Sequence, residues 1–304
     1  MKIGKYEIEI SNSDKVFFPD DGITKGDLVN YYAEIGDTML KYTKDRAIAM
    51  LRFPDGIDGE GFYQKDASDY FPDWIETENI SKKGGTVNHV VCNNADTLVY
   101  IANQGCITPH IWLSKIGNLN NPDRLIFDLD PSEGGFKQVR EAAEIIRDFL
   151  TEELELIAYV MTTGSKGLHV VTPLKPELDF DKVRGFARDV ADILAERFSD
   201  KLTAEISKEK RKGRLFLDTA RNAYAQTAVT PYSVRPKPGA PVATPIEWDE
   251  LKKSELGAQS YNIKNIFRRL SQKEDPWAKM DSRARSLKKS INMIESKQKK
   301  RTSS

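Results

Sequence analysis

Two aspartates, Asp128 and Asp130, carry the clearest chemical signal in the chain. Residues 124–130 read Arg-Leu-Ile-Phe-Asp-Leu-Asp, a composition typical of a buried strand. Side chains two residues apart on a strand point to the same face, so the two carboxylates would lie side by side while Phe127 and Leu129 enter the core. Neighbouring carboxylates repel unless a cation neutralises them, and a hard divalent ion with oxygen ligands would do so.

A third acid, Asp218, ends a second run of core-type residues, 215–217. It follows Asp130 by 88 residues (218 − 130), so only the fold could bring the two together. Three carboxylates at one place could hold two metal ions about 3.5–4 Å apart, an arrangement used in phosphoryl transfer. The three acids therefore predict a metal-dependent phosphoryl-transfer site.

Two other interpretations of these acids stay open. Asp128 to Pro131 is also what a strand looks like where it ends in a turn. An Asp-x-Asp after an apolar strand also opens phosphatases of the haloacid dehalogenase type, in which the first aspartate is the nucleophile. Those enzymes normally have Thr or Val two residues after the second aspartate, where this chain has Ser132.

A glycine-rich turn, residues 163–167, separates two apolar runs that read as strands, 158–162 and 168–171. It lacks the spacing of a Walker A loop and precedes a strand rather than a helix. Its small residues would still expose backbone N–H groups, and Lys166 would add a point charge for phosphate. His169 follows just beyond. Acids on one strand beside a Lys and a His on a hairpin would suit a metal–triphosphate.

Weaker signals occur in the first 112 residues. Thr24 and Asp27 would cap an expected helix, and Lys25 falls in its first turn. Backbone N–H groups in the first turn of a helix favour an anion. A lysine that simply faces solvent is the plainer interpretation of Lys25. Phe62 follows a Gly/Asp-rich loop, and its ring could stack on bases or form the loop's own small core. His110, at an expected element boundary, decides little by itself.

Composition limits the class of protein. The 304 residues are 39% hydrophobic, and 46 basic side chains balance 46 acidic ones. No window has the roughly 18 apolar residues of a membrane span, and the N-terminus has no apolar signal segment, so we expect a cytoplasmic protein with no membrane partner. Two cysteines without a Cys-x-x-Cys pair indicate neither a disulfide scaffold nor a zinc site. Amphipathic helices are expected over 137–154 and 180–198.

Several long motifs, in a consistent order, resemble the polymerase domain of prokaryotic DNA ligase D, within the archaeo-eukaryotic primase superfamily. The similar segments are residues 14–26, 52–65, 124–131, 163–169 and 230–242. The resemblance implies an α/β fold of the α+β kind, with mixed sheets in a primase-type catalytic core flanked by helices. We expect a catalytic domain over 1–280, with 5′-phosphate and DNA binding in about 1–85 and the catalytic core in about 86–255. Apolar periodicity fades after about residue 280 and basic residues gather there, which predicts a frayed or helical basic tail over 281–304.

The resemblance also assigns roles to residues. Two Mn²⁺ or Mg²⁺ ions are implied on Asp128, Asp130 and Asp218, with His110 as a further catalytic residue. Nucleotide contacts are implied for six residues: Arg52, Thr163, Ser165, Lys166, His169 and Arg235. The 5′-phosphate of DNA would be bound by Asn12, Lys15 and Lys25. Template bases would stack on Phe62 and Tyr63.

The activity that the resemblance implies is template-directed nucleotidyl transfer from NTP or dNTP, with a preference for ribonucleotides, in non-homologous end joining. The implied substrates are DNA gaps and ends with a 5′-phosphate. Ku, a separate DNA ligase and a second copy of the chain across a break are the implied partners. Two rival hypotheses remain: a non-catalytic end-binding module that recruits a ligase, and the dehalogenase-type phosphatase.

Overall fold

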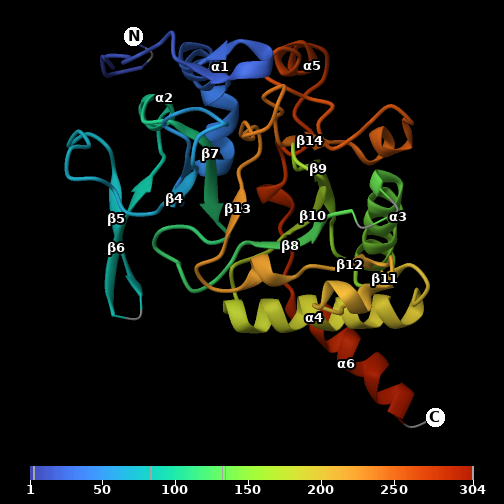
Figure 1. The fold of residues 1–304 in the computed structure, drawn as a ribbon. Helices are drawn as coiled ribbons and strands as arrows, with labels where there is room; N and C mark the ends of the chain where they lie inside the picture. Colours follow the sequence, from blue (N-terminus) through green and yellow to red (C-terminus); the bar gives the residue numbers. More distant parts are fainter. Residues whose placement is uncertain (3, 83, 132, 134, 303–304) are drawn as a thin grey trace. The chain divides into compact units, whose positions relative to one another are not determined.

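The computed structural model describes every residue except 3, 83, 132, 134 and 303–304, and only the backbone of 297–302. The chain forms two compact units, each assembled from three segments. The first unit comprises Met1–Gly117, Thr227–Thr244 and Gln259–Glu274, and the second comprises Asn118–Gln226, Pro245–Ala258 and Asp275–Ser304. Sheets and helices mix in both units (Figure 1), so the expected α/β fold with mixed sheets is confirmed.

The first unit is built on a six-stranded antiparallel sheet in the order β13-β7-β3-β6-β5, with β4 also paired to β3. Apolar β3 lies at its centre, and Ile48, Ala49 and Met50 are fully buried. The strands are β3 (Ala47–Arg52), β4 (Phe62–Gln64), β5 (Thr77–Lys82), β6 (Gly85–Val91), β7 (Cys106–Trp112) and β13 (Thr227–Val229).

Helices α1 (Lys25–Thr43), α2 (Ala95–Asn103) and α5 (Ile266–Gln272) complete this unit, with a short pair β1 (Val16–Phe18) and β2 (Ile23–Thr24) linked by the 3₁₀ turn η1 (Pro19–Asp21). Helix α1 starts at the predicted place, because Thr24 and Asp27 form a capping box. The helical spacing of its apolar residues was also predicted correctly, since Leu28, Tyr31, Tyr32 and Ile35 are all buried.

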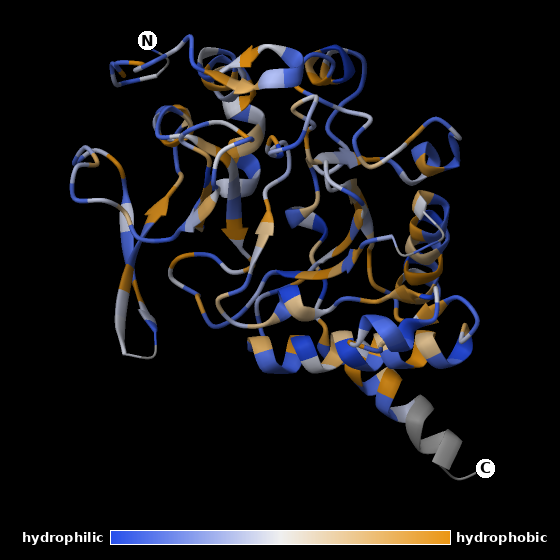
Figure 2. Ribbon diagram, viewed as in Figure 1, coloured by the Kyte–Doolittle hydropathy of each residue, from blue (hydrophilic) through white to orange (hydrophobic). Residues whose placement is uncertain are grey.

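The second unit contains a four-stranded sheet in the order β14-β9-β10-β8. Its strands are β8 (Arg124–Leu129), β9 (Tyr159–Thr162), β10 (Leu168–Pro173) and β14 (Thr244–Ile246). Helix α3 (Gly135–Asp148) packs on β10 and β8, and α4 (Phe180–Arg197) packs on β8 (Figure 1). Both helices mix apolar and polar residues along their length (Figure 2), and the apolar positions predicted for α4 are buried.

Short elements connect the second unit. Helix α3 continues into a π-helical turn, η2 (Phe149–Glu153). Two-residue strands β11 (Leu202–Thr203) and β12 (Leu215–Phe216) pair in parallel around the 3₁₀ turn η3 (Lys208–Arg211). Two more 3₁₀ turns are η4 (Ala220–Asn222) and η5 (Trp248–Lys252).

The C-terminal segment packs into the second unit through η6 (Asp281–Arg283) and α6 (Lys288–Thr302). Trp277, Leu287 and Ile294 are buried, and the Ser290 hydroxyl donates to the Leu154 carbonyl at 2.9 Å. Part of the expected basic tail is therefore anchored by apolar side chains, and Ser303–Ser304 lie outside the described residues. The expected domain limits at 85, 255 and 280 stay predictions.

Two local predictions were wrong. The strand carrying the acids ends at Leu129, so Asp130 is the first residue after β8. His110 does not stand at an element boundary but lies inside β7. Pro109, the residue before it, is also inside this paired strand, where proline is uncommon. The Pro109 carbonyl stays satisfied, because the Thr230 and Ser233 hydroxyls donate to it. Within the described residues, no helix is both long and apolar enough to span a membrane.

Candidate active site

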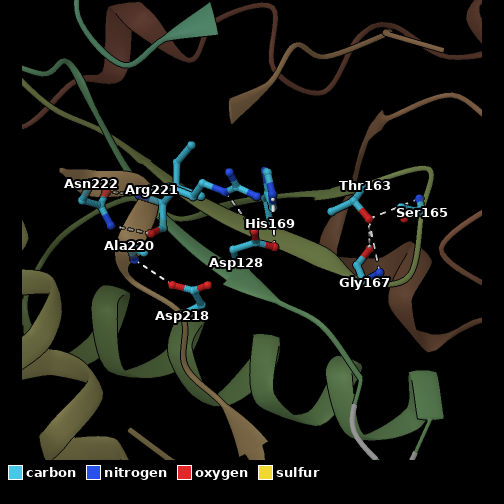
Figure 3. Close-up of polar contacts among 10 residues, drawn as sticks. Asp128, Thr163, Ser165, Gly167, His169, Asp218, Ala220, Arg221 and Asn222 are labelled. Carbon is cyan, nitrogen blue, oxygen red and sulfur yellow. Dashed lines mark hydrogen bonds and ion pairs between the residues drawn. The ribbon is translucent and has the colours of Figure 1, made fainter. Parts of the chain in front are cut away.

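Asp128 and His169 face each other across neighbouring strands of the second unit. They are direct partners in the antiparallel pairing of β8 with β10, so their side chains lie on the same face of the sheet. The His169 Nε2 atom is 3.3 Å from Asp128 Oδ1 (Figure 3). Both residues are buried. The sheet register, rather than a loop, therefore fixes this acid–histidine pair.

A second basic side chain, Arg221, reaches the same carboxylate and was not predicted from the sequence. Its Nε lies 3.1 Å from Asp128 Oδ2 (Figure 3). The neighbouring Asn222 side chain explains the placement, because its amide bonds both the N–H and the C=O of Ile126 on β8, at 2.8 and 2.7 Å. The sequence signal was a basic residue three positions after Asp218.

Asp218 lies beside Asp128 despite the distance between them along the chain. The two residues form an isolated antiparallel bridge, in which the Asp128 N–H donates to the Asp218 carbonyl at 3.0 Å. One oxygen of the Asp218 carboxylate accepts from the Ala220 N–H at 2.7 Å (Figure 3). The convergence expected of these two acids is therefore present.

Charge around the acids differs between Asp128 and Asp130. Burial alone would raise the pKa of Asp128, but the facing His169 and Arg221 outweigh burial and hold this pKa well below its usual range. The pKa of Asp130 is raised, first by burial and next by the Asp128 charge, although His169, Lys166 and Arg221 oppose the shift. Asp128 is thus firmly ionised, and Asp130 experiences its negative charge.

The three aspartates line one cavity of about 460 Å³. Its wall combines acidic side chains with three basic ones, all from the second unit. The 3₁₀ turn η3 supplies two of the three basic residues. The acids are Asp128, Asp130, Glu133 and Asp218, and the basic residues are Lys166, Lys208 and Arg211. Negative and positive groups facing one cavity suit a ligand that carries both cations and phosphates.

The glycine-rich turn connects β9 to β10 beside this cavity. The Thr163 hydroxyl is buried in the turn, donating to the Gly167 carbonyl at 3.1 Å and accepting from the Gly167 N–H at 3.2 Å (Figure 3). Gly167 has no room for a side chain, since a Cβ would lie 1.7 Å from the Leu129 carbonyl oxygen. Thr163 therefore shapes the turn, and Lys166 at its tip is the exposed group that faces the cavity.

The carboxylates of the cavity are suitable ligands for a hard divalent ion, although they do not yet surround a site for one. Among the residues that the structure describes, no three His, Cys, Asp or Glu side chains are grouped closely enough to hold an ion. The three aspartates nevertheless offer only oxygen ligands, the type that Mg²⁺ and Mn²⁺ prefer. The contacts of His169 and Arg221 with Asp128 occupy the carboxylate oxygens that a metal would bind.

The expected 5′-phosphate residues gather at the start of α1 in the first unit. Lys25 is a buried residue, and its Nζ donates to the Ser11 carbonyl at 2.6 Å and to the Ser11 hydroxyl at 2.9 Å. Lys15 pairs with Asp55, and Asn12 adopts a left-handed backbone (φ 49°) whose carbonyl accepts from the Lys15 N–H. Burial first, and the Lys15 charge second, lower the pKa of Lys25.

One reason given for this phosphate site was wrong. Free N–H groups were expected in the first turn of α1, but the N–H groups of Lys25 and Gly26 donate to the carbonyls of Lys15 and Ser13, each at 2.8 Å. The Asp27 N–H donates to the Thr24 hydroxyl. An anion at this cluster could therefore bind the ammonium groups of Lys15 and Lys25, but not the backbone N–H groups of the first turn of α1.

The remaining predicted residues also lie in the first unit. Phe62 and Tyr63, on β4, expose 45% and 55% of their surface, so neither belongs to a loop's own core. The Arg52 guanidinium lies 5.6 Å from the Phe62 ring centre, and Tyr63 meets the buried His110 ring edge to face at 5.4 Å. Arg235 is half-buried, and its backbone N–H donates to the Pro241 carbonyl at 2.7 Å.

Comparison with solved structures defines the class of fold. The chain is similar to the polymerase domain of Mycobacterium tuberculosis ligase D, solved in complex with DNA, with a TM-score of 0.86 and 30% sequence identity. The alignment covers 92% of this chain and 100% of that one. The fold is thus that of a ligase D polymerase domain.

Sequence comparison identifies the family. The family model for the LigD primase-polymerase domain matches residues 24–277, and the chain belongs to that family. Membership places it in a class of nucleotidyltransferases. The chain is 33% identical to the multifunctional non-homologous end joining protein LigD of Mycolicibacterium smegmatis, and 32% identical to that of Pseudomonas aeruginosa. It spans 37% and 32% of the length of these two curated relatives.

Proposed function

We propose that the protein is a template-directed nucleotidyltransferase that fills gaps and extends 3′ ends in non-homologous end joining. It would transfer a nucleotide from NTP or dNTP to a primer 3′-hydroxyl, preferring ribonucleotides. The observation that carries the proposal is the cavity in which Asp128, Asp130 and Asp218 face Lys166. The family and the end-joining role named for the relatives support the same conclusion.

The three aspartates would hold two divalent ions, Mn²⁺ or Mg²⁺. Such ions, when bound, make a hydroxyl more acidic and neutralise charge on a triphosphate. The chain's own contribution is to keep Asp128 ionised through His169 and Arg221, because only the carboxylate binds a cation.

The triphosphate would lie against the basic side of the cavity. Lys166 reaches it from the glycine turn, and Lys208 and Arg211 reach it from η3. Ser165 is half-buried beside Lys166 and stays a predicted phosphate contact, as do Thr163 and His169. Preorganised cations of this kind stabilise the charge that develops on a transferring phosphoryl group.

DNA would be engaged by residues of the first unit. Lys15 and Lys25, with Asn12, would bind the 5′-phosphate at a gap or break. The exposed rings of Phe62 and Tyr63 would stack on template bases. Arg52, His110 and Arg235 stay predicted nucleotide contacts. Ku, a separate DNA ligase and a second copy across a break remain proposed partners.

The structure favours this proposal over its two rivals. A dehalogenase-type phosphatase is disfavoured because Ser132 stands where that class normally has Thr or Val, and because the chain belongs to a different family. A non-catalytic end-binding module would have no need for a third acid at Asp218 beside an Asp128 of lowered pKa. The end-binding module gives no reason for acids and bases to share one cavity.

Primer extension on gapped DNA tests the proposal. The wild type should add nucleotides in the presence of Mn²⁺, more readily with NTP than with dNTP, and better when the gap has a 5′-phosphate. Asp128→Ala should bind the same DNA and incorporate nothing. Incorporation by that variant would refute the metal assignment, and a wild type that binds but never extends would support the end-binding module.

A further inference from the structure

A second cavity of the second unit shares a wall with the acid-lined one. Its volume is also about 460 Å³, and it opens over helix α4. Arg211, Phe216 and Asp218 line both cavities. Lys166 and Lys208 line only the first, whereas Arg184 and Arg188 line only the second. Asp218 is therefore accessible from two sides, each with its own pair of basic residues.

The shared wall is a fixed partition. The Arg211 guanidinium lies 4.1 Å from the Phe216 ring centre. It also donates from Nε to the Glu205 carbonyl at 3.0 Å and from Nη2 to the Ile206 carbonyl at 2.8 Å. These contacts hold the side chain between the two cavities. A ligand in one cavity thus meets a ligand in the other only near Asp218, the acid that both cavities share.

The two arginines on α4 are suited to an anionic ligand. They are four residues apart on the helix, so they lie on one face. Neither forms an ion pair with any residue that the structure describes, and the enclosed Nε of Arg184 has no hydrogen-bond partner within that part of the chain. The acidic residues that line the same cavity are Asp192 and Asp218. Ile206, 79% exposed, adds apolar surface.

Reaction geometry gives the second cavity a place in the proposed function, on which this inference rests. In nucleotidyl transfer the attacking and leaving oxygens are roughly in line through the phosphorus. If the leaving pyrophosphate lies toward Lys166 and Lys208, the attacking hydroxyl has to approach the acids from the other side. The cavity over α4 fits that requirement, because Asp218 lines it and Lys166 and Lys208 do not.

We propose that the cavity over α4 binds the 3′ end of the primer strand. Arg184 and Arg188 contact the phosphates just upstream of the terminal nucleotide, and the Phe216 ring and Ile206 contact the sugar and base. The terminal 3′-hydroxyl then lies at Asp218. The ligand class is a nucleic-acid strand with a free 3′-hydroxyl, distinct from the nucleoside triphosphate in the first cavity.

The test compares Arg184→Ala, Arg188→Ala and the double variant with Lys182→Ala, which removes the same charge from an exposed position on the same helix. Equilibrium binding of a primer–template is measured first, without nucleotide or metal. Each arginine removed should weaken it about tenfold, the size expected for one charge-assisted contact. The salt dependence of log affinity should also become shallower by roughly 0.7–0.9 per lost contact. Lys182→Ala should change neither quantity.

Steady-state kinetics separate the primer from the nucleotide. The double variant should raise KM for the primer and leave KM for NTP unchanged. Arg188→Lys should keep most of the affinity, since it keeps the charge. Arg188 is exposed, so Arg188→Ala serves as the informative variant should Arg184→Ala lower the melting temperature.

Three outcomes would overturn the inference: unchanged primer binding in the double variant, an equal loss in Lys182→Ala, or a rise in KM for NTP alone. Because binding is measured without turnover, the result stands apart from the proposed activity. A wild type that binds primer through these arginines but never extends it would refute the activity and leave the primer site in place.

Discussion

Asp128 and Asp218 are joined through their backbones, not their side chains. The N–H of Asp128 donates to the carbonyl of Asp218, and this bridge sets the second acid at the end of β8. Both side chains line the cavity, where the Asp128 carboxylate contacts His169 and Arg221 and the Asp218 carboxylate accepts one N–H. The acids can therefore be changed one at a time without removing the bridge.

Asp218→Asn should abolish most nucleotide incorporation and leave the fold intact. The amide keeps the size of the side chain and the backbone bridge, but it loses the charge that a divalent ion requires. We expect a fall in kcat of at least about a hundredfold, comparable to the loss of one electrostatic group in other active sites. Primer extension measures the rate, and thermal melting checks the fold.

Asp249→Asn is the matched control for that substitution. Asp249 is 85% exposed on its side chain and pairs only with Lys252 within the described residues. Its removal should leave incorporation unchanged. Equal activity of Asp218→Asn and the wild type would exclude Asp218 from the metal site.

Arg221→Gln should destabilise the metal-free protein and increase its response to Mn²⁺. Loss of the guanidinium leaves the buried Asp128 carboxylate without its arginine partner, which costs about 1–2 kcal/mol of unfolding free energy at neutral pH. Because the folded pKa of Asp128 is lowered, its stabilising contribution is complete above the unfolded value of 3.8 and is lost as pH falls through the folded pKa. The difference in unfolding free energy between Arg221→Gln and the wild type should therefore become smaller in strong acid.

Melting temperatures with and without Mn²⁺ check this prediction, with Arg221→Lys as the charge-conserving control. The ion should raise the melting temperature of Arg221→Gln more than that of the wild type, since it replaces the missing cation. A smaller rise in the variant would show that Arg221 supports the ion site instead of competing for it.

Local sequence patterns predicted much of the fold and the acids. The strand before Asp128, the hairpin around Lys166 and helix α4 follow from periodicity and turn residues, which are short-range properties. Asp218 could be proposed as a third acid from its place at the end of a strand, but its contact with Asp128 could not, because nothing near it in the chain shows that the two pair. Arg221 could not be predicted at all, since its place depends on Asn222 binding a strand about a hundred residues earlier.

The same limit applies to the first unit. The sequence correctly predicted the start of α1, yet it could not show that the loop carbonyls of Ser13 and Lys15 would use the helix donors. It placed His110 at a boundary because Pro109 precedes it, whereas pairing with β3 and β13 carries the strand through the proline. Pairing with distant strands therefore outweighs the tendency of Pro109 to end a strand.

Lys25 should make 5′-phosphate binding sensitive to alkaline pH. Burial and Lys15 lower its pKa from 10.5, so the ammonium is lost at a lower pH than in an ordinary lysine. Phosphate binds the charged form, so affinity should fall as pH rises through that lowered pKa. Lys25→Arg should remove this decline, because arginine stays charged.

The measurement is the affinity for DNA ends with a 5′-phosphate relative to ends with a 5′-hydroxyl, from neutral pH to pH values near 10. The ratio cancels effects on the rest of the interface. Equal pH profiles for the wild type and Lys25→Arg would mean that another group controls phosphate binding.

Tyr63→Ala should weaken template binding by a factor of about 5 to 100, which corresponds to the loss of one base stack. Tyr63→Phe should bind like the wild type, since the ring supplies the stacking surface. Tyr224→Ala, which removes another partly exposed tyrosine, should have no effect on template affinity. Fluorescence anisotropy with a template overhang measures the three affinities, and a similar loss in all three variants would argue against stacking at Tyr63.

Trp277→Ala should reveal how far the C-terminal segment supports the second unit. The indole is 2% exposed and donates from Nε1 to the Val160 carbonyl at 3.2 Å, on the strand next to β10. Removing a buried tryptophan costs about 3–5 kcal/mol, so the midpoint of chemical denaturation should fall markedly. Lys279→Ala, two residues away and exposed, should leave it unchanged. A stable Trp277→Ala would show that the sheet carrying His169 does not depend on this segment.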